Sequence, residues 1–200
     1  MQYTIFDTPV LKPLMKALSK MLHYILGWKT VDNFQRAPKY FIIAAPHTSN
    51  WDFPLLLSYG FVLNIKAYWM GKHTLFRWPF GPFFRWLGGL PIDRTRKSNT
   101  VDQCIEYFNT NREFVLGNAP EGTRKRVDRW KTGFYHIARG ADVPIVFAFL
   151  DYRKKIGGIG GQIIPSGNID LDMKEIMGFY SKVSGKHPEN FSGQYQDHPM

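Results

Sequence analysis

Short apolar runs alternate with segments of helical spacing through the middle of this chain, and this alternation constrains its fold more than any other feature. Apolar runs of this length predict strands, and the longer segments between them predict helices. The expected strands are 40–45, 66–70, 114–116 and 144–150, and the expected helices are 51–63, 101–109 and 131–139. Strands that alternate with helices usually form a parallel sheet. The sequence therefore predicts an α/β fold, a single layered domain with a mostly parallel central sheet flanked by helices.

An amphipathic helix is expected over residues 10–28, ahead of this pattern. Its apolar residues recur at helical spacing, and the polar residues fall largely on the other side: Lys12, Lys16, Ser19, Lys20 and His23. Such a helix either packs on the protein core or lies in the interface of a bilayer, with Trp28 near its end. Both possibilities are left open by the sequence.

The chain divides into three parts. An amphipathic membrane-interface segment over 1–37 is expected to precede one domain over 38–183, with a loosely ordered tail over 184–200. A glycine-rich stretch between Asp151 and Ile164 predicts an edge hairpin, and a last helix is expected from Asp170 or Asp172 to about Val183.

His47 follows the strand expected at 40–45, and Asp52 follows five positions later in the first turn of the helix expected at 51–63. Asn50 is placed to cap that helix, and a turn role is expected for Ser49. A near-neutral imidazole can take a proton from a hydroxyl, while a carboxylate fixes its tautomer and stabilises the cation that forms. The pair therefore predicts a general base.

Two later blocks strengthen this interpretation: Gly88-Gly89-Leu90-Pro91-Ile92-Asp93-Arg94, and Ala119-Pro120-Glu121-Gly122-Thr123-Arg124. In order and spacing, these blocks and the His-x4-Asp block resemble the glycerolipid acyltransferase family, which includes the 1-acylglycerol-3-phosphate acyltransferases. Val143-Pro144-Ile145-Val146 is a fourth, weaker match. The resemblance covers roughly residues 38 to 150.

The resemblance implies an O-acyltransferase. It would move a fatty acyl group from a thioester, either acyl-CoA or acyl carrier protein, to a lysophospholipid hydroxyl. The first acceptor to consider is 1-acylglycerol-3-phosphate, which gives phosphatidic acid. Other lysolipid or amino-acid-derived acceptors remain open, as does a noncatalytic phospholipid-binding module. His47 would be the base, and Asp52 would orient it. The chain contains no Gly-x-Ser-x-Gly elbow, which favours direct attack by the acceptor hydroxyl over an acyl-enzyme.

Six residues are expected to bind substrate: Lys72, Arg94, Glu121, Gly122, Thr123 and Arg124. Arg94 and Arg124 carry planar guanidinium groups suited to phosphate oxygens. Glu121 would accept a hydrogen bond from the glycerol hydroxyl, orient Arg124 or cap the next turn. Gly122 would permit close backbone approach, and Thr123 would bond the loop or the substrate. Lys72 lies where the family often carries a basic residue.

The formal net charge of +10 favours anionic partners. No nucleic-acid motif is recognisable, and residues 75–87 combine aromatic side chains with arginine, a composition typical of membrane interfaces. That segment is expected either to insert at a bilayer surface or to fold inward as core. A phospholipid surface is therefore the expected partner, and nucleic acid is not.

Neither a membrane-spanning run nor a secretory signal is recognised in the sequence, so a cytoplasmic protein, peripheral on the inner face of the membrane, is expected. The single cysteine, Cys104, excludes an internal disulfide and a multi-cysteine metal site, and it is expected to be a small buried side chain on a helix. No metal or cofactor is expected beyond the thioester co-substrate.

Overall fold

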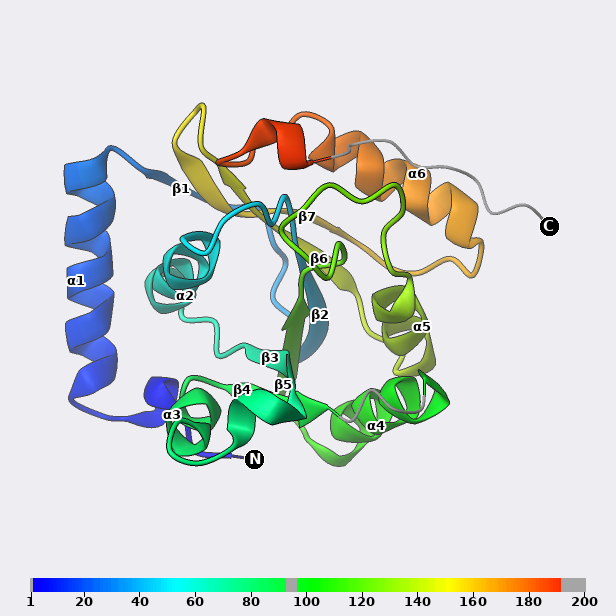
Figure 1. Ribbon diagram of the computed structural model, residues 1–200, viewed down its shortest axis with the longest axis horizontal. Helices are drawn as coiled ribbons and strands as arrows, with labels where there is room; N and C mark the ends of the chain where they lie inside the picture. Colours follow the sequence, from blue (N-terminus) through cyan, green and yellow to red (C-terminus); the bar gives the residue numbers. More distant parts are fainter. Residues whose placement is uncertain (1, 93–96, 192–200) are drawn as a thin grey trace.

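The computed structural model describes residues 2–92 and 97–191, and within these residues the chain forms one seven-stranded sheet (Figure 1). The strands are β1 (Lys29–Asp32), β2 (Lys39–Ala44), β3 (Tyr68–Lys72), β4 (Gly89–Ile92), β5 (Phe114–Asn118), β6 (Ile145–Asp151) and β7 (Ile156–Ile163). Their order across the sheet is β1-β7-β6-β2-β5-β3-β4. Five adjacent strands, from β6 to β4, run parallel, and β7 is antiparallel to β6. The predicted mostly parallel α/β fold is confirmed.

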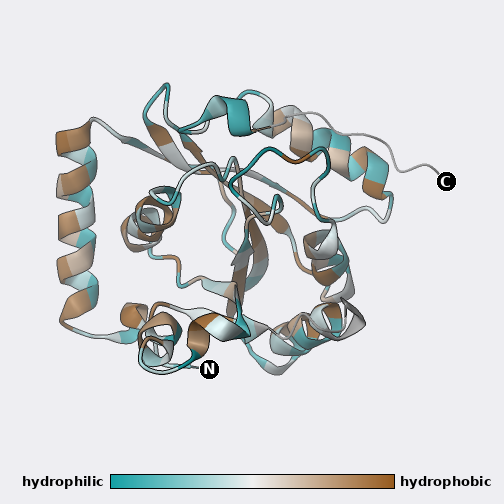
Figure 2. Ribbon diagram, in the orientation of Figure 1, coloured by the Kyte–Doolittle hydropathy of each residue, from teal (hydrophilic) through white to brown (hydrophobic). Residues whose placement is uncertain are grey.

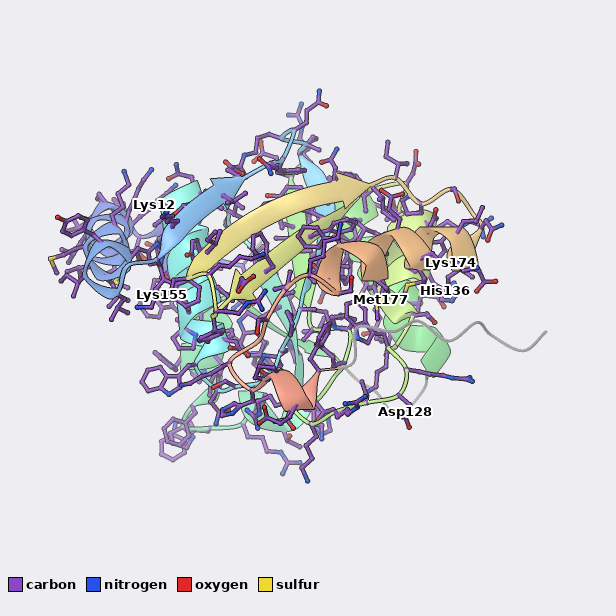
Figure 3. All side chains as sticks on the ribbon, turned by 90° about the horizontal axis from the view of Figure 1, so that it is seen from above. Lys12, Asp128, His136, Lys155, Lys174 and Met177 are labelled. Atoms are coloured by element: carbon purple, nitrogen blue, oxygen red, sulfur yellow. The ribbon has the colours of Figure 1, made fainter. Side chains whose placement is uncertain are left out.

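Helices cover both faces of this sheet (Figure 1). They are α1 (Leu11–Leu26), α2 (Asp52–Leu63), α3 (Gly81–Trp86), α4 (Lys97–Thr110), α5 (Gly133–Gly140) and α6 (Ile169–Tyr180). Three short 3-10 helices complete the described elements: η1 (Ile5–Asp7), η2 (His73–Phe76) and η3 (Pro188–Asn190). In Figure 3, α6 with Lys174 and Met177 lies far from α1 with Lys12.

The alternation of side chains along β2 explains the two layers. Phe41 and Ile43 point to one face and join the larger core, which includes residues of α4, α5 and α6. Tyr40 and Ile42 point to the other face and join a smaller core with residues of α2. Each fully buried Phe or Ile side chain contributes about 1.5 to 3 kcal/mol. Because both faces are covered, β2 reads as a continuous apolar run rather than as an alternating one.

Two edge strands were not expected from the sequence. β1 is mostly exposed and polar, which hides it from a search for apolar runs. Because β1 pairs in parallel with β7, the hairpin of β6 and β7 is not at the edge, and the expectation of an edge hairpin is wrong. The sheet therefore extends into the segment assigned to residues 1–37. β4 contains Pro91, which cannot donate to a ladder and is tolerated at the opposite edge.

The side of helix α1 that faces the protein is mixed: Leu11 and Met15 pack against the cluster of Phe6 and Phe61, and two polar residues lie beside them. Ser19 and His23 are buried, and His23 Nε2 lies 2.7 Å from Ser58 Oγ on α2. The large apolar residues of α1 that remain exposed are Leu14, Leu18, Met21, Leu22, Tyr24, Ile25 and Leu26. In Figure 2 the hydrophobic stripe of α1 faces away from the rest of the molecule. The helix is thus held by both apolar and polar contacts, and most of its large apolar residues face outward.

The aromatic segment 75–87 divides between buried and exposed positions. Phe76 and Leu87 are buried, whereas Trp78, Phe80 and Phe83 are exposed, Trp78 by 89%. Part of the segment therefore completes the core, and part forms an exposed aromatic surface at α3. Within the described ranges, no helix combines the length and apolar character that a membrane span requires.

Candidate active site

The site lies at the carboxyl ends of the parallel strands, where α/β sheets usually bind ligands. The loop after β2 carries His47 into the start of α2, and His47 Nδ1 lies 3.1 Å from Asp52 Oδ2. The Asp52 side chain is only 1% exposed, whereas that of His47 is 25% exposed. Since Nδ1 faces Asp52, Nε2 is the ring nitrogen that can reach a substrate. The two residues of the predicted dyad are therefore in contact, with Asp52 buried and His47 partly exposed to solvent.

Asp52 is fixed by four hydrogen-bond partners. The backbone N–H groups of Thr48 and Ser49 each donate to Oδ2 at 2.8 Å, and the Tyr152 hydroxyl donates to Oδ1 at 2.7 Å. Burial by itself raises the pKa of Asp52, but the hydrogen bonds from His47, Tyr152 and Ser49 together outweigh it and hold the pKa below its ordinary value. Asp52 therefore stays ionised and can stabilise a positive charge on His47.

The other polar residues of this loop have local roles. Ser49 Oγ accepts from the Trp51 backbone N–H at 3.2 Å, which is the expected turn role. Asn50 does not cap α2 as expected: the N-cap position is Trp51, with no side-chain cap bond. The Asn50 side chain instead accepts a hydrogen bond from Arg124 Nη1. The Asp52 carboxylate instead accepts the N–H groups of Thr48 and Ser49, which precede the helix, and so fixes the loop.

Glu121 lies beneath the dyad and is 4% exposed. Its Oε1 accepts the backbone N–H of His47 at 3.0 Å, and its Oε2 is buried with no hydrogen-bond partner among the described residues. Burial raises the pKa of Glu121 to about 7, against a smaller lowering by the His47 N–H. This contact with the His47 backbone is an additional one, beyond the three roles expected for Glu121. It forms because β5 is adjacent to β2, so the loop after β5 lies next to the loop that carries His47.

The remaining residues of the Glu-Gly-Thr-Arg block form a tight surface turn. Gly122 has φ +66° in the left-handed region, which favours glycine, and its N–H donates to Ala119 O at 3.1 Å. Thr123 Oγ1 accepts from Lys125 N at 3.3 Å, so Thr123 bonds the loop. The turn thereby brings the exposed Arg124 guanidinium next to the loop that follows His47.

Of the two remaining residues expected to bind substrate, the structure describes Lys72 but not Arg94. Lys72 is the last residue of β3, exposed at the same end of the sheet, with β5 between β3 and β2. Arg94, expected to bind phosphate, lies outside the described residues, as does Asp93 beside it. Lys72 is not among the described residues that line the cavity beside the dyad.

That cavity, of about 470 Å³, opens beside the His47 loop. It is lined by Thr48, Ser49, Asn50, Trp51, Arg124, Lys186, His187 and Asn190. Three of these come from residues 184–191, within the segment expected to be a loose tail. The His187 backbone N–H donates to Thr48 Oγ1 at 3.2 Å, and Lys186 Nζ lies 5.4 Å from the centre of the Trp51 ring. Sequence reasoning missed this segment because it contains no local motif.

Tyr152 was missed as well, although its position contains a signal. It directly follows β6, at the same carboxyl edge of the sheet as His47. Cys104, by contrast, lies where it was expected, fully buried on α4, and burial raises the pKa of its thiol to about 12. Among residues 2–92 and 97–191, no group of three or more His, Cys, Asp or Glu side chains is arranged to hold a metal ion.

The chain is similar to known proteins over the part that carries this site. It is 32% identical over 112 residues to the 1-acyl-sn-glycerol-3-phosphate acyltransferase of Escherichia coli (strain K12), covering 52% of this chain and 44% of that protein. The enzyme of the same name from Haemophilus influenzae is 30% identical over 107 residues, 50% of this chain and 43% of its own length. The matches thus span less than half the length of these relatives.

The fold is similar to the crystal structure of the 1-acyl-sn-glycerophosphate (LPA) acyltransferase PlsC from Thermotoga maritima. The TM-score is 0.60 at 18% identity, with 86% of this chain and 77% of that chain covered. The model of the Acyltransferase family matches residues 29–148, which include β1 to β5, most of β6, the His47–Asp52 dyad and Glu121. On this match over more than half of its length, the chain belongs to the Acyltransferase family.

Proposed function

We propose that this protein is an O-acyltransferase that transfers a fatty acyl group from a thioester to the free hydroxyl of 1-acylglycerol-3-phosphate, giving phosphatidic acid. The observation that carries the proposal is the 3.1 Å contact of His47 Nδ1 with an ionised, buried Asp52, beside a cavity lined by cationic side chains. The curated relatives named for this activity support the choice of acceptor.

In the proposed reaction His47 Nε2 takes the proton of the acceptor hydroxyl as its oxygen attacks the thioester carbonyl carbon. The new C–O ester bond forms and the C–S bond breaks, and the imidazolium returns its proton to the leaving thiolate. Asp52 stabilises the imidazolium between these steps. Direct attack is favoured over an acyl-enzyme, because Cys104 is fully buried on α4 and the Ser49 hydroxyl is engaged in the turn by the Trp51 N–H.

The acceptor phosphate is assigned to the cavity beside the His47 loop. The cations Arg124 and Lys186 line it, together with His187, whose Nδ1 lies 3.6 Å from Glu189 Oε1. A phosphate monoester is attracted by such a set of charges, and Arg124 offers two parallel N–H donors to it. Acyl-CoA and acyl carrier protein are both anionic thioesters, and either is compatible with a chain of net charge +10.

The acceptor and the product are lipids, so we propose that the protein works at a phospholipid surface. The outward apolar side of α1 and the aromatic surface at α3, with Trp78, Phe80 and Phe83, support this. Exposed apolar area of this extent is unusual on a protein that meets only water. Lys12 and Lys20 are exposed on α1, where they can reach anionic headgroups.

The test measures thiol release from palmitoyl-CoA with and without 1-acylglycerol-3-phosphate, for the wild type and His47→Ala, with the lipid product identified by mass spectrometry. Acceptor-dependent release that is lost in the variant supports both the reaction and the base. If palmitoyl-CoA is inert, acylated carrier protein and other lysolipids are tried. A wild type that is silent with all of these, yet binds phospholipid vesicles, would contradict the enzyme proposal and favour a binding module.

A further inference from the structure

Tyr152 is the one partner of Asp52 that comes from a distant part of the described chain, one hundred residues away. Its hydroxyl lies 2.7 Å from Oδ1, whereas Thr48 N, Ser49 N and His47 Nδ1 all contact Oδ2. The two oxygens of the carboxylate thus have different partners: Oδ2 accepts from the loop that carries His47, and Oδ1 accepts from Tyr152.

The position of Tyr152 is fixed on three sides. Its backbone N–H donates to Ser184 O at 2.9 Å, and its ring lies edge-on to Trp28 with centroids 5.1 Å apart. It sits in the turn between β6 and β7, so the hairpin holds its backbone. Burial, and then the hydrogen bond to Asp52, raise the pKa of Tyr152 above its ordinary value. The hydroxyl therefore keeps its proton and is a donor to Asp52 throughout the neutral range.

We infer that Tyr152 is a positioning residue for the proposed acyl transfer: its hydroxyl locks the Asp52 carboxylate in the rotation that aligns Oδ2 with His47 Nδ1. Rotation of the carboxylate about its Cβ–Cγ bond would move Oδ2 out of line with His47 Nδ1, and the donor on Oδ1 adds to the contacts on Oδ2 that oppose this rotation. The inference rests on the proposed function. It goes beyond the family blocks, because Tyr152 lies after residue 148, where the family match ends.

The titratable groups that face Asp52 are His47 on its own loop, Tyr152 after β6 and Glu121 after β5. Loss of the Tyr152 hydroxyl removes a donor that stabilises the ionised carboxylate. The dyad then holds a proton more tightly, and the acid limb of the pH–rate profile moves to higher pH. A residue that only filled space beside Asp52 would leave that limb in place.

The experiment compares Tyr152→Phe with Tyr59→Phe. Tyr59 is a matched control: its ring also packs on Trp28 and its hydroxyl donates to Lys29 O at 3.0 Å, but it does not contact Asp52. With palmitoyl-CoA and 1-acylglycerol-3-phosphate, kcat of Tyr152→Phe is expected to fall roughly 10- to 100-fold. Its acid limb should lie at higher pH than that of the wild type and of Tyr59→Phe. Equal profiles for the two variants would overturn the inference.

A double-mutant cycle checks that Tyr152 acts through Asp52. In an Asp52→Asn background the Tyr152→Phe change should cost little further activity, because the carboxylate that it orients is already gone. Full additivity of the two losses would contradict a shared role.

A second measurement does not depend on turnover. The ¹³C signal of the Asp52 carboxyl, identified by its loss in Asp52→Asn, is titrated in the free protein. The pKa of Asp52 should be higher in Tyr152→Phe than in Tyr59→Phe, and equal values would overturn the inference. A wild type inactive with every thioester and lysolipid would refute the proposed function, whereas an active wild type with unchanged Tyr152→Phe would refute only the role of Tyr152.

Discussion

Glu121 Oε1 accepts the backbone N–H of His47 at 3.0 Å, across 74 residues of sequence. This bond joins the loop after β5 to the loop after β2, so the proposed base is held by its peptide group as well as by Asp52. The carboxylate that makes it is almost completely buried, which makes the junction sensitive to protonation.

Glu121→Gln is expected to change the pH dependence of stability. A pKa raised from 4.5 to about 7 means that the folded protein binds more protons than the unfolded chain between these values. Stability therefore falls as pH rises through this window, by about 3 kcal/mol over its full width. Urea unfolding at pH 5 and pH 7.5 measures the effect. The difference in free energy of unfolding between the wild type and Glu121→Gln should change by about 2 to 3 kcal/mol between these two pH values.

The control for Glu121 is Glu175→Gln, which replaces an exposed glutamate on α6. Its free energy of unfolding should change between the two pH values by the same amount as that of the wild type. If the free energy of unfolding of Glu121→Gln also changes by that amount, a buried carboxylate that titrates at this position is refuted.

Asp52→Asn is expected to lower kcat/KM on the order of 10³-fold, because a neutral amide cannot stabilise the imidazolium of His47. The fold should survive, since the amide oxygen can still accept from Thr48 and Ser49. Asp172→Asn is the control: Asp172 is also buried and accepts from the Tyr135 hydroxyl at 2.8 Å, but it lies on α6 outside the site. An Asp52→Asn variant as active as Asp172→Asn would refute the dyad.

Lys186→Met is expected to raise KM for 1-acylglycerol-3-phosphate roughly 5- to 10-fold, with kcat little changed, because a charge-assisted contact to the phosphate is lost. KM for the thioester should stay constant if the cavity serves the acceptor. Lys182→Met removes the same charge four residues earlier, outside the cavity of the His47 loop, and should leave both constants unchanged. A rise in KM for the thioester alone would reassign the cavity to the donor.

The α1 surface predicts weaker vesicle binding for the double variant Leu18→Glu/Ile25→Glu. The loss of two large apolar side chains from the lipid interface weakens the binding free energy by about 3 kcal/mol or more. The partition coefficient onto anionic vesicles, measured by sedimentation, should therefore fall roughly 100-fold or more. Leu171→Glu, at a leucine on α6 that is also exposed, is the control and should bind as the wild type does. Equal binding by both variants would show that α1 does not meet the membrane.

The sequence by itself determined the layers of this fold and the pair at the centre of its site. Apolar runs such as 40–45 specify buried strands because both faces of β2 are covered, and this information is local. His47 and Asp52 are equally local, since five residues of one loop and helix start bring them within 3.1 Å. The Glu-Gly-Thr-Arg block was recognised in the same way, by resemblance over a short stretch.

Tertiary structure alone decided what surrounds that pair. Tyr152, Glu121 and Lys186 reach the His47 loop from strand ends and a terminal segment 74 or more residues away, and no local pattern encodes such contacts. The orientation of α1 was also undetermined, because periodicity defines two sides of a helix without saying which side meets the protein. Contacts with distant residues define the inward side: Leu11 and Met15 pack against the cluster that contains Phe61, and His23 Nε2 lies 2.7 Å from Ser58 Oγ on α2.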